Sequence, residues 1–368
     1  MTLVSEDVSR SDIAEDAERA AYLEGLSEGR WDLRWLHDDR PAWGAKAALR
    51  PGVGLTLKAT NQVEPYGRIE ARAPGGSMAP RGCVTEEGLP AMGYTYNSKY
   101  QVWAENVESL YDEAVSRQWD ATRDIPWHDL EPLPPDMERA MCQVSTMLTE
   151  VEFIAADFPA MWSWQMNQHF HEVKLFLATQ AMDEARHLEV FRKRALANGG
   201  GLGIAARTTE RALASIRAAD SYIKGSYMMH VLGEGIVLDI FRAGEFLSPT
   251  DVEKKIFRMC MQDEARHVSY GTMHLKYFLE HHPDPVEAKE ELHAFADAAE
   301  PIIFRVFTAP SVIEPFAVLA GEGVDGIESG FEAIRILWVK IVEEYLRRCE
   351  RAGFDRRGRC KVGTAAPF

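Results

Sequence analysis

Hydrophobic residues recur every three to four positions over most of the chain after about residue 98. This spacing places apolar side chains on one face of a helix. It predicts helices over 98–118, 136–168, 170–198, 207–246, 248–282, 285–320 and 326–352. The four central segments, between 136 and 282, have the lengths that are typical of a helical bundle.

Residues 1–97 follow a different pattern, in which Gly and Pro recur and no helical spacing is sustained. We interpret this segment as an irregular arm or cap over the bundle. The alternative is a partly ordered leader over the first 25 residues. The predicted organisation is therefore an irregular arm over 1–97, a helical domain over 98–355 and a tail over 356–368.

Composition excludes several classes of protein. The chain has 368 residues with 57 acidic and 41 basic side chains, a net charge of −16 that disfavours nucleic acid or an anionic membrane as partner. Its five cysteines contain no C-x-x-C pair, so neither a disulfide framework nor a zinc ribbon is expected. The N-terminus is polar and no run of 18 apolar residues occurs, which predicts a cytoplasmic protein without a membrane span.

The segment Asp-Glu-Ala-Arg-His occurs twice, 80 residues apart. Each copy holds a Glu and a His three positions apart, and on a helix such residues share one face. The two pairs are Glu184 with His187 and Glu264 with His267. Since a carboxylate beside an imidazole is a ligand pair for transition metals, two such pairs predict a two-metal site in a helical bundle.

A site of this kind takes one further Glu from each of two other helices. Glu234 is an acid in an otherwise apolar segment, and a buried acid is costly unless it is paired or coordinated. On the helix before the first motif, Glu150 and Glu152 are both candidates. They lie two positions apart, so they cannot face the same way. The apolar pattern around them does not separate the two.

Four carboxylates and two neutral imidazoles form a mixed ligand set that suits iron or manganese better than zinc. We expect two iron ions, with a mixed Mn/Fe pair as the alternative. Asp183 and Asp263 precede the motif glutamates, and Arg186 and Arg266 precede the histidines. A ligating His usually donates its second N–H to an acceptor, so we expect these aspartates, held by the arginines, to orient the histidines.

These motifs resemble the ferritin-like di-iron carboxylate superfamily, and most of all the hydroxylase α subunits of bacterial multicomponent monooxygenases, which carry DE-x-RH in both halves. Glu152, in VEFIAAD, is similar to their first Glu, and Glu234, in GEG, to their third. We therefore prefer Glu152 to Glu150. The resemblance covers roughly residues 100–355. The expected metal ligands are Glu152, Glu184, His187, Glu234, Glu264 and His267.

The resemblance implies an all-α, ferritin-like four-helix bundle with extra C-terminal helices and the irregular N-terminal arm. It implies a di-iron oxygenase that uses O2 as co-substrate and hydroxylates C–H bonds of an apolar or aromatic small molecule. A reductase or ferredoxin would supply electrons, and a homodimer is compatible with the superfamily. The alternatives are N-oxygenation of an amine, as in the related arylamine N-oxygenases, desaturase or oxidase chemistry, and a metal-storing or structural bundle without turnover.

Two positions depart from the relatives. The monooxygenases have Thr four residues after the third Glu, where this chain has Leu238. The N-oxygenases have a further His ligand four residues before the last Glu, where this chain has Cys260.

Two residues one helical turn from Glu152, and two on the helix that carries Glu234, are expected either to line a substrate pocket or to pack in the core. They are Leu148, Ala155, Gly233 and Leu238. Such small or apolar side chains suit an apolar substrate. His230 lies four positions before Glu234 and is expected to be either an extra ligand or substrate contact, or a hydrogen-bonded core histidine.

Overall fold

The computed structural model describes residues 8–368, so residues 1–7 of the predicted arm lie outside the described residues. The described residues form helices and no β-strand, apart from three isolated β-bridges. This confirms the predicted all-α class. Within the same residues no single helix is long and apolar enough to cross a membrane, although the bent pair Pro285–Thr308 and Pro310–Ala320 meets the length and composition requirement together.

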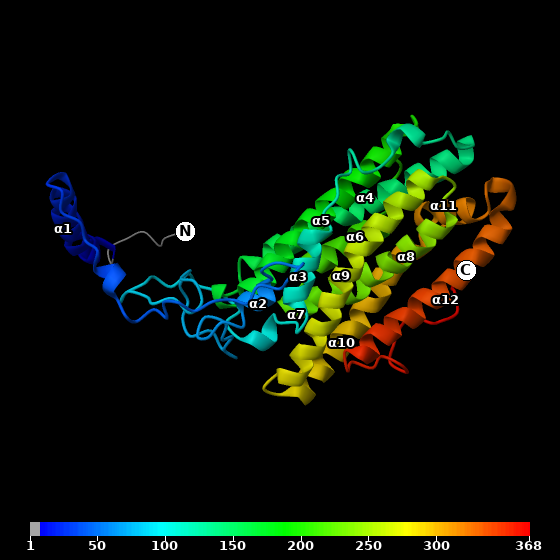
Figure 1. Ribbon diagram of the computed structural model, residues 1–368. Coiled ribbons are helices and arrows are strands. Elements are labelled where there is room, and N and C mark those ends of the chain that lie inside the picture. Colours follow the sequence, from blue (N-terminus) through cyan, green and yellow to red (C-terminus); the bar gives the residue numbers. More distant parts are fainter. Residues whose placement is uncertain (1–7) are drawn as a thin grey trace.

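Two antiparallel helical hairpins form the core, and they pack side by side (Figure 1). One hairpin joins α4 to α5 and the other joins α8 to α9. Their bounds are α4 Pro135–Ser163, α5 His171–Ala197, α8 Glu234–Leu247 and α9 Asp251–His281. Each helix keeps an apolar face toward the others, and the contact between α5 and α9 joins the two hairpins.

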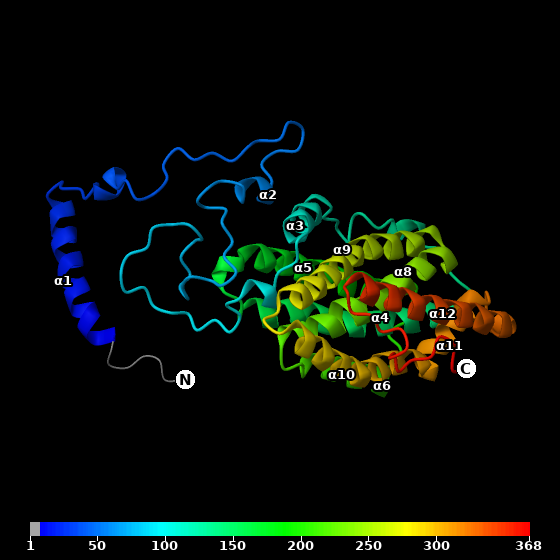
Figure 2. The same ribbon diagram turned by 90° about the horizontal axis from the view of Figure 1, so that it is seen from below.

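Further helices cover this core (Figure 2). The helix α3 lies against α5 and α9, α6 packs between α4 and α10, and α11 contacts α4 and α12. Their bounds are α3 Val107–Ser116, α6 Arg207–Arg217, α10 Pro285–Phe304, α11 Pro310–Ala320 and α12 Ile327–Arg351. A 3-10 turn at Arg305–Thr308 separates α10 from α11, which starts at Pro310 because proline fits the first helical position.

The predicted continuous helix over 207–246 is interrupted, which corrects the sequence interpretation. After α6 the backbone becomes extended at Ser221, and α7 (Tyr222–Ser226) then leads into a π-helix over Tyr227–Gly233 before α8 begins. The wider π-turns bring His230 against α9, where a Cβ on Gly271 would lie 2.2 Å from the His230 Cβ. Buried, mostly apolar residues continue through the π-helix, so the hydrophobic pattern does not mark the change of backbone there.

The predicted helix over 98–118 is also too long. A short 3-10 turn, Lys99–Gln101, precedes α3, and Val102, Trp103 and Ala104 between them are buried. These three consecutive side chains all face the core, which a regular helix does not allow.

The N-terminal arm is mostly turns and bends over 28–98, with the short helix α2 (Leu57–Thr60). The helix α1 (Val8–Ser27), absent from the prediction, lies apart from the bundle (Figure 2). A buried ion pair between Arg81 and Glu172 at the start of α5 attaches the later part of the arm to the bundle. The boundaries of the arm and tail remain predictions.

Candidate metal centre

The six side chains predicted as ligands come together at the centre of the bundle. They form two groups, in each of which one possible ligand atom per residue lies within 4.8 Å of the others. The groups are Glu152, Glu184, His187, Glu264 and Glu184, Glu234, Glu264, His267. Glu184 and Glu264 belong to both groups, so two metal ions would share them as ligands. All six side chains are buried.

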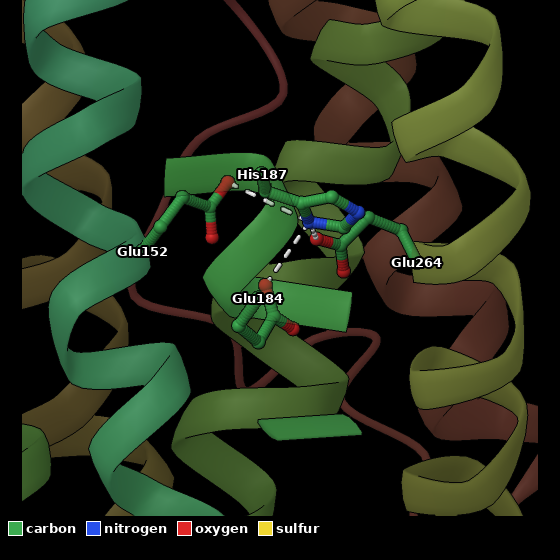
Figure 3. Close-up of side chains that lie close together, drawn as sticks. All are labelled: Glu152, Glu184, His187 and Glu264. Atoms are coloured by element: carbon green, nitrogen blue, oxygen red, sulfur yellow. Dashed lines mark hydrogen bonds and ion pairs between the residues drawn. The ribbon is translucent and has the colours of Figure 1, made fainter. Parts of the chain in front are cut away.

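Each core helix contributes to this centre: α4 carries Glu152, α8 carries Glu234, and α5 and α9 carry one Glu-x-x-His pair each. Figure 3 shows the first group, whose side chains point toward one another from three helices. The His187 Nδ1 atom lies 3.1 Å from Glu184 Oε2, 3.3 Å from Glu264 Oε1 and 3.9 Å from Glu152 Oε1.

The second group has matching geometry. The His267 Nδ1 atom lies 2.9 Å from Glu184 Oε1, 3.5 Å from Glu264 Oε2 and 3.8 Å from Glu234 Oε1. In both histidines the Nδ1 atom therefore faces the carboxylates and the Nε2 atom faces away. This arrangement leaves Nδ1 as the ligand atom.

The residues present fit a pair of cations. One oxygen on each glutamate, and the His267 Nδ1 atom, are buried without a hydrogen bond within the described part of the chain. Buried polar atoms in folded proteins nearly always have a hydrogen-bond partner. A set of such atoms that converge without partners therefore indicates a missing ligand. The four glutamate atoms are Glu152 Oε1, Glu184 Oε1, Glu234 Oε2 and Glu264 Oε2. Oxygen and imidazole donors together suit iron or manganese.

The electrostatics of the centre lead to the same conclusion. Burial, together with repulsion from Glu184, raises the pKa of Glu152 well above its usual value. Burial also raises the pKa of Glu234, with Glu264 adding repulsion. Without cations, these acids therefore tend to hold protons. Two divalent ions would balance four carboxylates and remove that tendency.

The predicted orienting residues lie against the histidines, but the aspartate of each motif contacts the histidine of the other motif. The His187 Nε2 atom lies 3.2 Å from Asp263 Oδ2, and the His267 Nε2 atom lies 3.3 Å from Asp183 Oδ2. Two arginines hold these aspartates in the same crossed way. Arg186 Nη2 donates to Asp263 Oδ2 at 3.1 Å, and Arg266 Nη2 donates to Asp183 Oδ2 at 2.9 Å. Each arginine also pairs with the aspartate of its own motif.

Two residues after α3 complete this charged group and were missed by the sequence interpretation. Trp119 Nε1 donates to Asp263 Oδ2 at 2.7 Å, and Gln118 accepts a hydrogen bond from Arg186. Both contacts join segments far apart in the chain, and no spacing in the sequence marks them.

His230 is not part of either ligand group. Its Nδ1 atom lies 2.9 Å from Ser226 Oγ, and its Nε2 atom lies 3.1 Å from Gln180 Oε1. Gln180 in turn donates to Glu234 Oε1 at 2.8 Å. His230 is therefore a hydrogen-bonded core histidine that reaches Glu234 through Gln180. The sequence contained a signal for Gln180, a polar residue one turn before Glu184 on the ligand face of α5.

Glu150, the alternative first ligand, lies beside Glu210 of α6. Burial and the nearby Glu210 carboxylate raise its pKa to about 7. It belongs to neither ligand group, whereas Glu152 belongs to one. The structure therefore favours Glu152 over Glu150.

An apolar cavity of about 60 Å³ adjoins the carboxylates and lies between α4, α6, α8 and α10. Ala155 and Gly233, two of the four predicted pocket residues, are in its wall. Leu148 and Leu238 are not, because they are buried in the core between the helices. The sequence interpretation missed the contributions of α6 and of the turn after α10, which are Thr209, Ala212, Leu213, Ile216, Val306 and Phe307.

No protein-family model matches the chain, and no curated protein matches its sequence. Two solved structures of R2-like ligand-binding oxidase mutants are similar in fold; one has an aerobically and the other an anaerobically reconstituted Mn/Fe cofactor. Both are 16% identical in sequence, and the matches cover 68% of this chain and 94% of theirs, with TM-scores of 0.54 and 0.53. The specific likeness to hydroxylase α subunits stays a prediction. At this identity the likeness shows the fold alone, and it confirms that the chain folds as a ferritin-like helical bundle.

Proposed function

We propose that this protein is a di-metal oxidoreductase that activates O2 and inserts oxygen into an apolar small molecule. The observation that carries the proposal is the convergence of six buried ligand side chains, with unsatisfied atoms, beside an apolar cavity. The structural neighbours, which are R2-like ligand-binding oxidases with a reconstituted Mn/Fe cofactor, support this proposal. Two iron ions are our first choice for the metals and a Mn/Fe pair the second.

The metals, when bound, supply the electrons that reduce O2. The chain supplies the surroundings of that chemistry. Glu184 and Glu264 would hold both ions, and the crossed Asp–Arg group fixes the direction of each imidazole. The aliphatic cavity wall excludes water, which protects reactive species and strengthens electrostatic interactions inside.

We further propose C–H hydroxylation as the reaction, with a reductase or ferredoxin as electron donor and a homodimer as the assembly. N-oxygenation of an amine and desaturase or oxidase chemistry are the competing reactions. Labelled O2 separates them, because only oxygen insertion places the label in the organic product.

The first experiment is anaerobic loading with Fe(II), metal counting, and stopped-flow absorbance after mixing with O2. We expect about two irons per chain and a transient visible band. Glu184→Ala and Glu264→Ala should abolish both, because each removes a carboxylate shared by the two groups. Glu189→Ala is the matched control, since Glu189 lies on α5 but is exposed.

Two irons per chain that do not react with O2 would contradict the proposal and leave a structural metal site. Uptake of many irons per chain would favour storage. Loss of the band in Glu189→Ala would show that the assay reports damage to α5 and not loss of a ligand.

A further inference from the structure

The wall of the cavity beside the metal centre holds one polar side chain that the metal site does not use. Three glutamates of the centre reach the cavity, and the remaining wall residues in the described chain are apolar except Thr209. Thr209 comes from the first turn of α6 and is fully buried.

The hydroxyl of Thr209 has no hydrogen-bond partner within the described residues. Buried helical threonines usually donate to the carbonyl four residues earlier. In this chain Thr146, Thr149 and Thr272 all do so, at 2.7–2.8 Å. Thr209 lies in the first turn of its helix, where the chain four residues earlier is not helical. Its hydroxyl therefore has no backbone partner, and Thr209 is part of the cavity wall.

A buried hydroxyl without a partner is unfavourable, and such groups in folded proteins call for an explanation. Here the explanation is a ligand. We propose that Thr209 binds the polar group of the substrate, so that the cavity selects small, slender molecules that combine an apolar chain with one hydroxyl or amine. This inference rests on the proposed function, because it places the substrate in the cavity beside the metals.

The cavity supports this substrate class by its size and its chemistry. Its volume of about 60 Å³ is well below the ~150 Å³ of a cavity that holds benzene, which favours a slender molecule. A threonine hydroxyl donates and accepts, so it pairs with an alcohol or an amine. A site with one polar group in an apolar wall discriminates against analogues that leave this group unpaired.

The test compares two probes of similar length, ethanol and chloroethane, whose chlorine is a much weaker hydrogen-bonding group. Binding to the Fe(II)-loaded protein is measured anaerobically by calorimetry. We expect the wild type to prefer ethanol. Thr209→Val should weaken the binding of ethanol about fivefold, the ratio that one net hydrogen bond provides, without changing the binding of chloroethane. Thr209→Ser keeps the hydroxyl and should keep the preference.

The matched control is Thr208→Val. The Thr208 hydroxyl also lacks a partner in the described residues, but it is not in the cavity wall, so its loss should leave both probes unchanged. Thr209→Val removes no protein hydrogen bond, so its Tm and iron content should match the wild type. Equal binding of both probes, no binding of either, or equal weakening of both by Thr209→Val would overturn the inference.

This experiment separates the inference from the proposed function. If the ferrous protein reacts with O2 but Thr209→Val binds ethanol as the wild type does, the inference alone fails. If the probe preference depends on Thr209 but the ferrous protein ignores O2, the proposed function fails and the binding site stands.

Discussion

At the residue scale, the crossed pairing of the two motifs is the feature that sequence spacing could not show. Each histidine is oriented by the aspartate of the other motif, and each aspartate contacts both arginines. The four charged side chains balance one another in a buried position, where loss of a single partner is costly. One substitution in either motif should therefore disturb both metal positions.

The first prediction concerns Asp183. Asp183→Asn keeps the shape of the side chain but removes the charge that faces His267 Nε2 and Arg266. We expect Fe(II) affinity to fall by about 10–100-fold, because partners that orient a ligating imidazole contribute this much. Anaerobic Fe(II) titration measures it, and Glu189→Gln on the exposed side of α5 should leave it unchanged. Unchanged affinity in Asp183→Asn would refute the orienting role.

The second prediction concerns Glu150, whose folded-state pKa is raised to about 7 by burial and by Glu210. A raised acid pKa means that the folded state binds more protons than the unfolded chain, so stability falls as the pH rises from about 4.5 to 7. Glu150→Gln should therefore stabilise the protein by roughly 1 kcal/mol at pH 8, after allowance for solvent screening, and much less at pH 5.

Thermal unfolding at the two pH values checks this prediction. Glu210→Gln should increase the stability at pH 8 by less than Glu150→Gln does. The double variant should be stabilised by less than the sum of the two single effects, because each substitution relieves the same repulsion. A gain that is equal at both pH values would show that ionisation of Glu150 is not its cause.

At the element scale, hydrophobic periodicity located the four core helices, because each keeps one apolar face along its length. The repeated Glu-x-x-His spacing located four of the six candidate ligands. Periodicity did not locate the π-helix at Tyr227–Gly233, since buried residues continue through it. It also could not show that α6 forms part of the cavity wall, because that depends on how α6 packs against α4.

The third prediction tests the contact between α9 and the π-helix. A Cβ on Gly271 would lie 2.2 Å from the His230 Cβ, so one of the two helices must shift. Gly271→Ala should destabilise the protein by about 1–3 kcal/mol, as overpacking does, and should lower metal affinity through Gln180 and Glu234.

Denaturant unfolding and Fe(II) titration measure these two effects. Gly75→Ala is the control, because a Cβ there meets nothing within 4 Å. A Gly271→Ala protein with normal stability would show that this contact yields easily and does not fix the π-helix.

At the scale of the whole molecule, the metal centre joins the two hairpins. The hairpin of α4 and α5 carries three of the candidate ligands, and the hairpin of α8 and α9 carries the other three. Bound cations would therefore link the hairpins, whereas without cations the buried Glu152 and Glu234 tend to hold protons at the same interface. The stability of the bundle should depend on metal more than that of a bundle with an apolar core.

The last prediction follows from this arrangement. Burial raises the pKa of Glu152 and Glu234 in the metal-free protein, so its stability should fall as the pH rises through the raised pKa values. Metal binding requires deprotonated ligands, so it should stabilise the protein more at high pH, where the metal-free protein is less stable. A metal at 100 times its Kd adds about 2.7 kcal/mol per site, which corresponds to a Tm increase of several degrees.

Calorimetry of the metal-free and Mn(II)-loaded proteins measures the difference between their Tm values. This difference should be larger at pH 8 than at pH 6, and Glu264→Gln should reduce it. A gap of equal size at both pH values would mean that protons and metal do not compete for these carboxylates, and the six-residue ligand set would have to be revised.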